Sequence, residues 1–101
     1  MFEIGDFVDV MSPAQVERQG IVLACGHRSK QRLVISLRSL TKAVQYPNRK
    51  LYMMWEHCTD LVFVRQATTD DLPLSVEELL CFPNEEIRRL TVSILSREEV
   101  K

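Results

Sequence analysis

Seven basic side chains in the middle of the chain have the clearest potential for chemistry with a partner. Residues 28–50 contain seven lysines and arginines and no acidic residue. A row of such cations neutralises nucleic-acid phosphates, and each neutralised phosphate releases a condensed counterion. Tyr46, and Tyr52 or Trp55 if they are exposed, would stack on unpaired bases. The predicted nucleic-acid-binding residues are Arg28, Lys30, Arg32, Arg38, Lys42, Tyr46, Arg49 and Lys50.

The charge of the whole chain supports a different interpretation of the same segment. Residues 1–66 carry nine basic and six acidic side chains, whereas residues 67–101 carry four basic and eight acidic ones. The net charge is −1 and the pI is near 6.1, well below the value of about 9 expected of a dedicated nucleic-acid binder. The basic segment is therefore equally well explained as a solvated face that the acidic C-terminal part neutralises.

Cysteine and histidine side chains give a weaker signal for a metal site or a nucleophile. Cys25 and His27 share one face if they lie on a strand, and His57 and Cys58 would complete four ligands. Structural zinc sites more often contain Cys-x2-4-Cys pairs, and nothing in the sequence marks Cys58 as activated by His27. With only three glycines, the chain also lacks a phosphate-binding loop. We expect no metal, no cofactor and no enzymatic activity.

Length and cysteine usage indicate one cytoplasmic domain. A chain of 101 residues is too short for two ordinary cores, and its three cysteines form no disulfide pattern. The first residues resemble no export signal, and the longest stretch without charge has nine residues, from Gln19 to His27. A membrane-spanning helix needs about 20 apolar residues, so we expect no membrane partner.

The elements that must position these side chains are mostly strands. Phe7, Val8 and Val10 interleave with two aspartates, which predicts a first strand, and residues 11–19 are predicted to be a loop. Residues 39–50 fit either a helix or, as we favour, a hairpin. Trp55 and Phe63 are predicted to be buried, because aromatic residues on apolar strands usually pack in the core. The predicted strands are Gly5–Val10, Gly20–Ala24, Leu33–Arg38, Leu51–Trp55 and Leu61–Val64.

The opening strand carries a family resemblance. The pattern Gly-Asp-x-Val-x-Val from Gly5, followed after a polar loop by Gly-x-Val from Gly20, resembles the start of SH3-like small β-barrels such as KOW, CAP-Gly and Tudor-type modules. The resemblance covers about residues 4–65. It implies a five-stranded barrel in which one short helical turn joins the fourth and fifth strands, and a possible peptide groove lined by Tyr52, Trp55 and Phe63.

Two short helices are predicted after residue 66. Ser75 and Glu78 form a capping pair for the first helix, which ends before Pro83, and Asn84 caps the second. In the second helix one face is apolar, and this face would pack on the barrel or on a second copy of the chain. The apolar face consists of Ile87, Leu90, Ile94 and Leu95.

The sequence thus predicts an α+β fold, mainly β, with an SH3-like barrel over residues 1–66 and a two-helix extension over residues 67–101 packed on it as one domain. The first functional hypothesis is a non-catalytic module that binds DNA, RNA or a ribonucleoprotein through the basic segment. The alternative is protein interaction or homodimer formation through the C-terminal helices or an edge strand.

Overall fold

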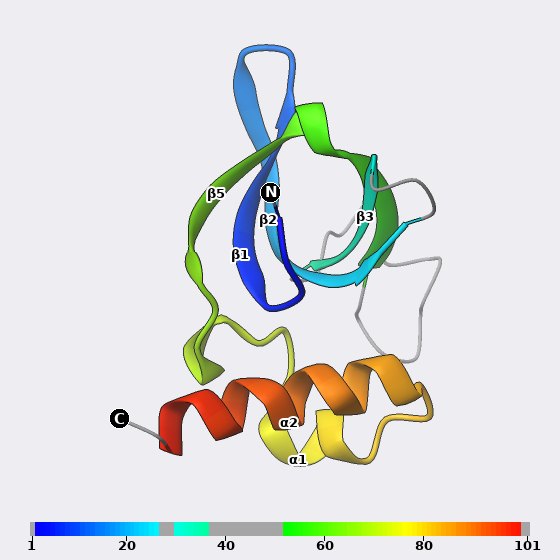
Figure 1. Ribbon diagram of the computed structural model, residues 1–101, viewed down its shortest axis with the longest axis vertical. Coiled ribbons are helices and arrows are strands. Elements are labelled where there is room, and N and C mark those ends of the chain that lie inside the picture. The colour runs from blue at the N-terminus through cyan, green and yellow to red at the C-terminus, as the bar shows by residue number, and fades with distance from the viewer. Residues whose placement is uncertain (1, 27–29, 37–51, 100–101) are drawn as a thin grey trace.

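A computed structural model describes residues 2–26, 30–36 and 52–99 of the chain. It contains one antiparallel sheet of five strands in the order β4-β3-β2-β1-β5, followed by two helices (Figure 1). The strands are β1 (Asp6–Ser12), β2 (Gln15–Cys25), β3 (Gln31–Ser36), β4 (Tyr52–His57) and β5 (Leu61–Gln66). The helices are α1 (Val76–Leu80) and α2 (Glu85–Glu99), with single 3-10 turns η3 (Cys58–Asp60) and η4 (Thr69–Asp71).

The predicted α+β class is confirmed. The sheet bends strongly, and both helices lie together along one end of it in Figure 1. Within the described residues the outer strands β4 and β5 do not pair with each other, so the sheet is not closed into a barrel. The segment 39–50, with its alternatives of hairpin or helix, lies outside the described residues.

The central strands are buried on both faces, because side chains one residue apart in a strand enter different cores. Phe7 and Ile21 belong to a core shared with the helices, whereas Val8 and Val22 belong to a second core inside the bend of the sheet. The third strand is covered on both faces for the same reason. Val34 and its neighbour Ile35, which face opposite sides, are both buried.

The predicted loop over residues 11–19 is also wrong, since most of it forms a hairpin between β1 and β2. Met11 pairs with Val16 and Ser12 with Gln15, which leaves only Pro13 and Ala14 in the turn. Ala14 has φ 74°, the left-handed conformation that a type II turn requires at the residue after its proline. A run without apolar alternation can still be a strand where neither of its faces reaches a core.

The predicted helix signals are confirmed. The Ser75 hydroxyl oxygen accepts a bond of 3.2 Å from the Glu78 N–H, and the Asn84 side-chain oxygen accepts one of 3.1 Å from the Ile87 N–H. The apolar face of α2 packs on the sheet of the same chain, where Ile87, Leu90 and Ile94 are buried. α2 has 15 residues, so it is longer than predicted. In the described part of the chain, no helix is long and apolar enough to cross a membrane.

Arg97, near the end of α2, ties the helical layer to the start of β1 and the end of β5. Its Nη2 donates to the main-chain oxygens of Ala67, at 2.9 Å, and Gly5, at 3.3 Å. Gly5 has φ 96°, and a Cβ at this position would lie 3.1 Å from Arg97 Nη2. The glycine is therefore required both by its backbone conformation and by the closeness of the guanidinium group.

We predict that Gly5→Ala lowers the free energy of unfolding by about 1–3 kcal/mol, because alanine is strained at this φ and displaces Arg97. Urea unfolding followed by circular dichroism measures the change. Ala14→Gly is the matched control, since it removes strain at another left-handed position and should raise stability. Equal stability of the wild type and Gly5→Ala would contradict the proposed role of the contact.

Candidate functional site

Most of the predicted nucleic-acid-binding residues cannot be placed. Six of the eight lie outside the described residues, and only Lys30 and Arg32 lie within them. The six are Arg28, Arg38, Lys42, Tyr46, Arg49 and Lys50.

Arg32 is part of the fold. Its side chain is on β3 and the residue is only 3% exposed. The guanidinium Nε donates to the Phe2 carbonyl oxygen at 2.9 Å, and Nη1 donates to the Gln31 carbonyl oxygen at 3.0 Å. These bonds satisfy donors of a buried cation and fix the N-terminal segment against the sheet.

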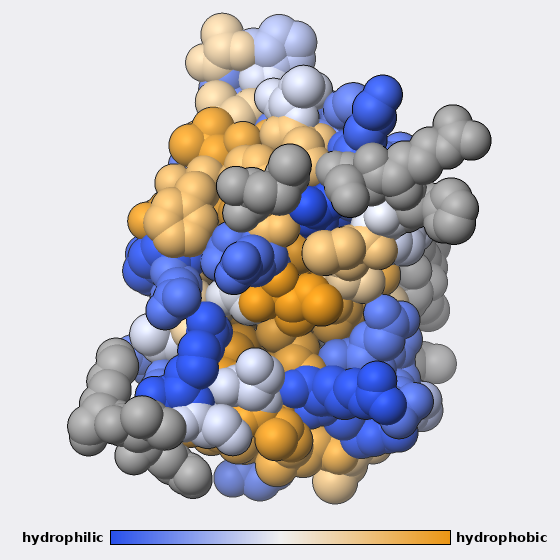
Figure 2. Space-filling view, in the orientation of Figure 1, coloured by the Kyte–Doolittle hydropathy of each residue, from blue (hydrophilic) through white to orange (hydrophobic). Residues whose placement is uncertain are grey.

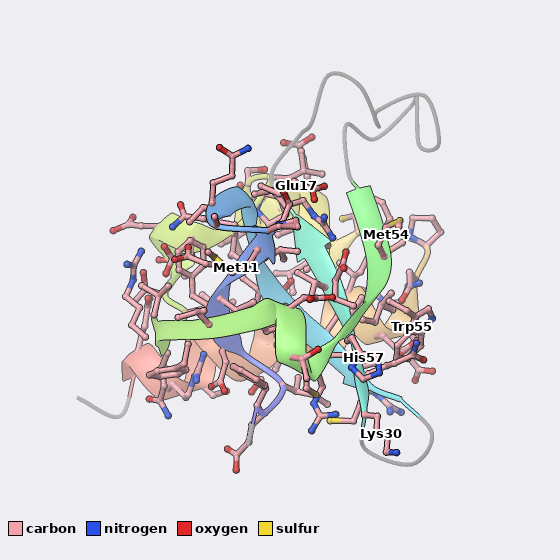
Figure 3. The ribbon with its side chains drawn as sticks, turned by 90° about the horizontal axis from the view of Figure 1, so that it is seen from above. Met11, Glu17, Lys30, Met54, Trp55 and His57 are labelled. Carbon is pink, nitrogen blue, oxygen red and sulfur yellow. The ribbon has the colours of Figure 1, made fainter. Side chains whose placement is uncertain are left out.

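Lys30 lies at the same end of the sheet as the exposed residue Trp55. Lys30 precedes β3, whose first residue pairs with His57, and its carbonyl oxygen accepts a bond of 3.0 Å from the Cys58 N–H. In Figure 3, Lys30, His57 and Trp55 lie near one another at the end of β4. Trp55 is 48% exposed, so the prediction that it is buried is wrong. Its ring rests on Gly26, where a Cβ would come within 3.1 Å of the ring.

The cysteines offer no arranged metal site in the part of the chain that the structure describes. None of the three cysteines forms a disulfide; Cys25 and Cys81 are exposed, and Cys58 is half-buried. Among the described residues, no group of three or more histidine, cysteine, aspartate or glutamate side chains is arranged to hold a metal ion. His27, the fourth predicted ligand, lies outside these residues.

The longest run of exposed apolar side chains in the sheet lies on β5, an outer strand. Val62, Phe63 and Val64 are 49%, 53% and 37% exposed, and we call these three residues the β5 edge. Val62 lies opposite Asp9 of β1 and Phe63 opposite Val8, so their side chains point to opposite faces. The β5 edge is therefore apolar on both faces, and the predicted burial of Phe63 is wrong. Figure 2 shows apolar patches at the surface of the molecule between charged side chains.

The hydrogen-bonding side of β5 is also open. β5 pairs with β1 on one side and, among the described residues, with no strand on the other. The register with β1 shifts between Phe7 and Val8, which makes Val64 the extra residue of a β-bulge. The strand can therefore accept another strand along Leu61–Val64, the stretch that contains no charge.

Arg65 and Asp71 hold the end of β5 in place. The Arg65 guanidinium forms an ion pair with Asp71 and lies 4.5 Å from the centroid of the Phe7 ring. Asp71 also accepts a bond of 2.9 Å from the Thr68 N–H. Burial raises the pKa of Asp71, but the bonds from Arg65 and Thr68 and the charge of Arg65 outweigh it. The pKa of Asp71 is consequently below its usual value of 3.8.

Comparison of the chain with protein-family models, with curated proteins and with solved structures found no match. The site must be interpreted from its own geometry.

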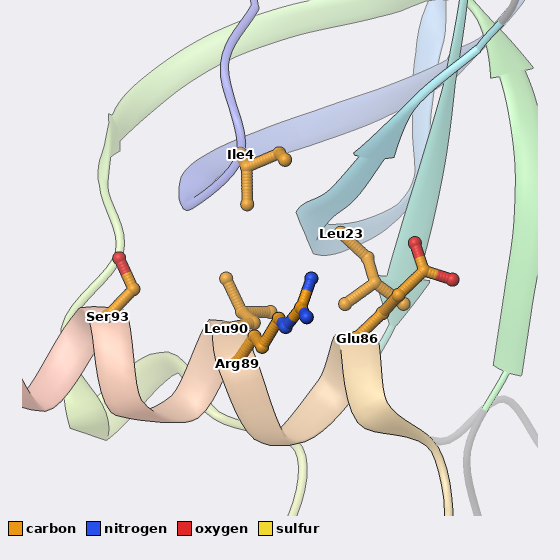
Figure 4. Close-up of a pocket in the computed structure, with 6 residues that line it drawn as sticks. All are labelled: Ile4, Leu23, Glu86, Arg89, Leu90 and Ser93. Atoms are coloured by element: carbon orange, nitrogen blue, oxygen red, sulfur yellow. The ribbon is translucent and has the colours of Figure 1, made fainter.

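A second apolar feature is a hollow of about 390 Å³ between α2, β2 and the N-terminal segment. Ile4, Leu23 and Leu90 point into it, and Glu86, Arg89 and Ser93 of α2 surround it (Figure 4). Its volume is within the range of small ligand sites, and its walls suit an apolar side chain with a polar group at the rim.

Sequence reasoning placed β5 correctly but missed its exposure. Leu61–Val64 is an apolar run, and such a run predicts a strand without saying which of its faces is covered. The order of the strands along the chain gave no signal for this exposure, because it does not fix which strands are outer: β1 comes first and yet lies between β2 and β5. Only Leu61 of β5 is buried.

We predict that Asp71→Asn lowers the free energy of unfolding by about 1–2 kcal/mol at pH 7, because it removes a buried carboxylate that caps η4 and pairs with Arg65. The folded-state pKa is lowered, so the carboxylate stabilises the fold above pH 3.8 and this contribution disappears as the pH falls through the folded pKa.

Urea unfolding of both proteins, in steps from pH 7 down to about pH 2, measures this difference. The stabilities of wild type and Asp71→Asn should converge at the acid end. The exposed neighbour Asp70 provides the control, and Asp70→Asn should cost less than about 0.5 kcal/mol at pH 7. A gap between wild type and Asp71→Asn that is constant with pH would contradict the assignment.

Proposed function

We propose that this chain is a small non-catalytic module that binds protein, and that the β5 edge is its binding surface. The observation that carries the proposal is the exposure of three consecutive apolar residues on an outer strand of the sheet. Natural proteins usually protect such strands with charges, with proline, with β-bulges or by covering them, since an open edge pairs readily with other chains. β5 has a bulge at Val64, but Leu61–Val64 contains neither a charge nor a proline. An apolar edge without a charge fits a surface that is covered by a partner.

The mode of binding is strand addition. An extended segment of the partner would form main-chain hydrogen bonds with the open side of β5, which supply affinity independently of sequence. Its alternating side chains would meet Val62 on one face of the sheet and Phe63 on the other, which supplies specificity. The ion pair between Arg65 and Asp71 ends the apolar stretch and sets where the added strand must stop.

As part of this proposal, we assign the sheet to the SH3-like class. The strand order β4-β3-β2-β1-β5, the strong bend of the sheet and the 3-10 turn η3 between β4 and β5 support the assignment. We also place the module in the reducing cytoplasm. The absence of a disulfide among Cys25, Cys58 and Cys81 is consistent with that compartment.

A photo-crosslinking amino acid at position 63 tests the binding surface in the native host. We expect it to give a protein adduct that the same amino acid at position 92 does not give, because Val92 is equally exposed, at 52%, but lies on α2. The identified protein should then bind the purified chain, and Phe63→Lys should weaken this binding at least about tenfold. Adducts of equal yield at both positions, or none, would refute the proposal.

One observation favours nucleic-acid binding as a second candidate function. Lys30 lies opposite Cys58 at the end of β4, three residues along from Trp55, so a cation and an exposed aromatic residue occur at the same end of the sheet. Proteins bind single strands by stacking bases on such rings while cations contact the phosphates.

Fluorescence tests this candidate directly, since Trp55 is the single tryptophan of the chain. If it binds bases, a short oligothymidylate should quench the fluorescence at low salt, and the apparent affinity should fall as salt rises. Lys30→Gln should reduce the slope of log affinity against log salt by about 0.7, the value for one phosphate contact on a single strand. Fluorescence that does not change with oligonucleotide at low salt would eliminate this function.

A further inference from the structure

We propose that the partner on the β5 edge is a second copy of this chain, paired antiparallel about a two-fold axis at Phe63. This inference rests on the proposed function, because it names the occupant of the same surface. It goes further in stating the symmetry, the orientation and the residue at the axis.

The apolar part of the β5 edge is complementary to itself. In antiparallel pairing centred on Phe63, the two Phe63 rings lie opposite each other, and Val62 of each copy lies opposite Val64 of the other. A two-fold contact uses the same patch on both subunits, so a patch must match itself to serve in one. Cross-strand pairs of aromatic and β-branched residues are among the stabilising combinations in sheets.

The charges at the two ends of β5 select the antiparallel orientation. The exposed residue Asp60 precedes the strand, and Arg65, whose side chain is 52% exposed, lies near its end. Antiparallel pairing brings Asp60 of one copy beside the exposed part of Arg65 of the other, which also pairs with Asp71 of its own chain. Parallel pairing would place like charges together, which is unfavourable.

The contact would also satisfy the open main-chain groups of β5. The N–H and C=O groups on its open side have no strand partner among the described residues. Pairing two copies there joins two five-stranded sheets into one continuous ten-stranded sheet and removes both open β5 edges at once. A head-to-tail contact of β5 with β4 would instead leave one edge open on each terminal copy and add further copies.

Light scattering after size-exclusion chromatography measures the association over micromolar to millimolar concentrations. The wild type should approach twice the chain mass of 11.7 kDa and no more. Phe63→Lys sets two ammonium groups against each other at the axis and should weaken dimer formation at least about tenfold. Val92→Lys, an equally exposed substitution on α2, should leave the dimer unchanged. Melting curves confirm that both variants are folded.

A disulfide tests the position of the axis. In a chain with Cys25, Cys58 and Cys81 replaced by serine, Phe63→Cys should form a covalent dimer on mild oxidation. Opposite Cα atoms in antiparallel strands are about 4.5–5.5 Å apart, which is within the range that a disulfide spans. Val92→Cys in the same background should remain monomeric under denaturing conditions.

Three results would overturn the inference: a monomeric wild type at millimolar concentration, a mass above that of a dimer, or a dimer that dissociates with Val92→Lys and not with Phe63→Lys. A monomer whose photo-crosslinker at position 63 captures a different protein refutes the second copy and leaves the proposed function standing. A monomer that gives no adduct refutes both.

Discussion

The structure depends on one constraint: β1, β2 and β3 must be covered on both faces. Phe7, Ile21 and Ile35 face a core completed by the helices, and their neighbours face a core formed inside the bend of the sheet. A flat sheet under one helical layer would leave the second set of side chains in water, so the strong bend follows from the burial of these residues. The two cores share the same three strands. An outer strand is not covered in this way on both faces, and only Leu61 of β5 is buried in a core.

The helical layer is joined to the sheet at the point where β1 begins and β5 ends. Arg97 donates to Gly5 and Ala67, and the Glu98 carboxylate accepts a bond of 2.8 Å from the Thr69 N–H. On the far side of the sheet, Arg18 of β2 and Glu56 of β4 form an ion pair across the bend, with little of either side chain exposed. Such partly buried ion pairs fix the relative positions of the strands but add little to the free energy of unfolding, because desolvation offsets much of their attraction. These contacts position β5 and leave its outer side open.

Much of the fold could be predicted from local patterns. The five strands, the two helix caps and the apolar face of α2 depend on neighbours within about four residues, and those neighbours are visible in the sequence. The β1–β2 hairpin could not be predicted in this way, because Gln15, Val16 and Glu17 are all exposed and the segment has no apolar alternation. The proposed binding surface was harder to predict than the hairpin. Trp55 and Phe63 have the residue types of a core, and hydrophobicity alone does not distinguish a buried aromatic side chain from an exposed one.

The sequence by itself determined the places of the five strands and the two helices, the α+β class and the separation of charge between the two parts of the chain. These are set by composition and by periodicity along a single segment. Only the tertiary structure decided that Arg32 is buried against the Phe2 carbonyl oxygen and that Trp55 and the β5 edge are exposed. The physical reason is that exposure is a property of the neighbours that the fold supplies. β5 begins with four apolar residues, yet among the described residues it has one neighbouring strand where β1 has two.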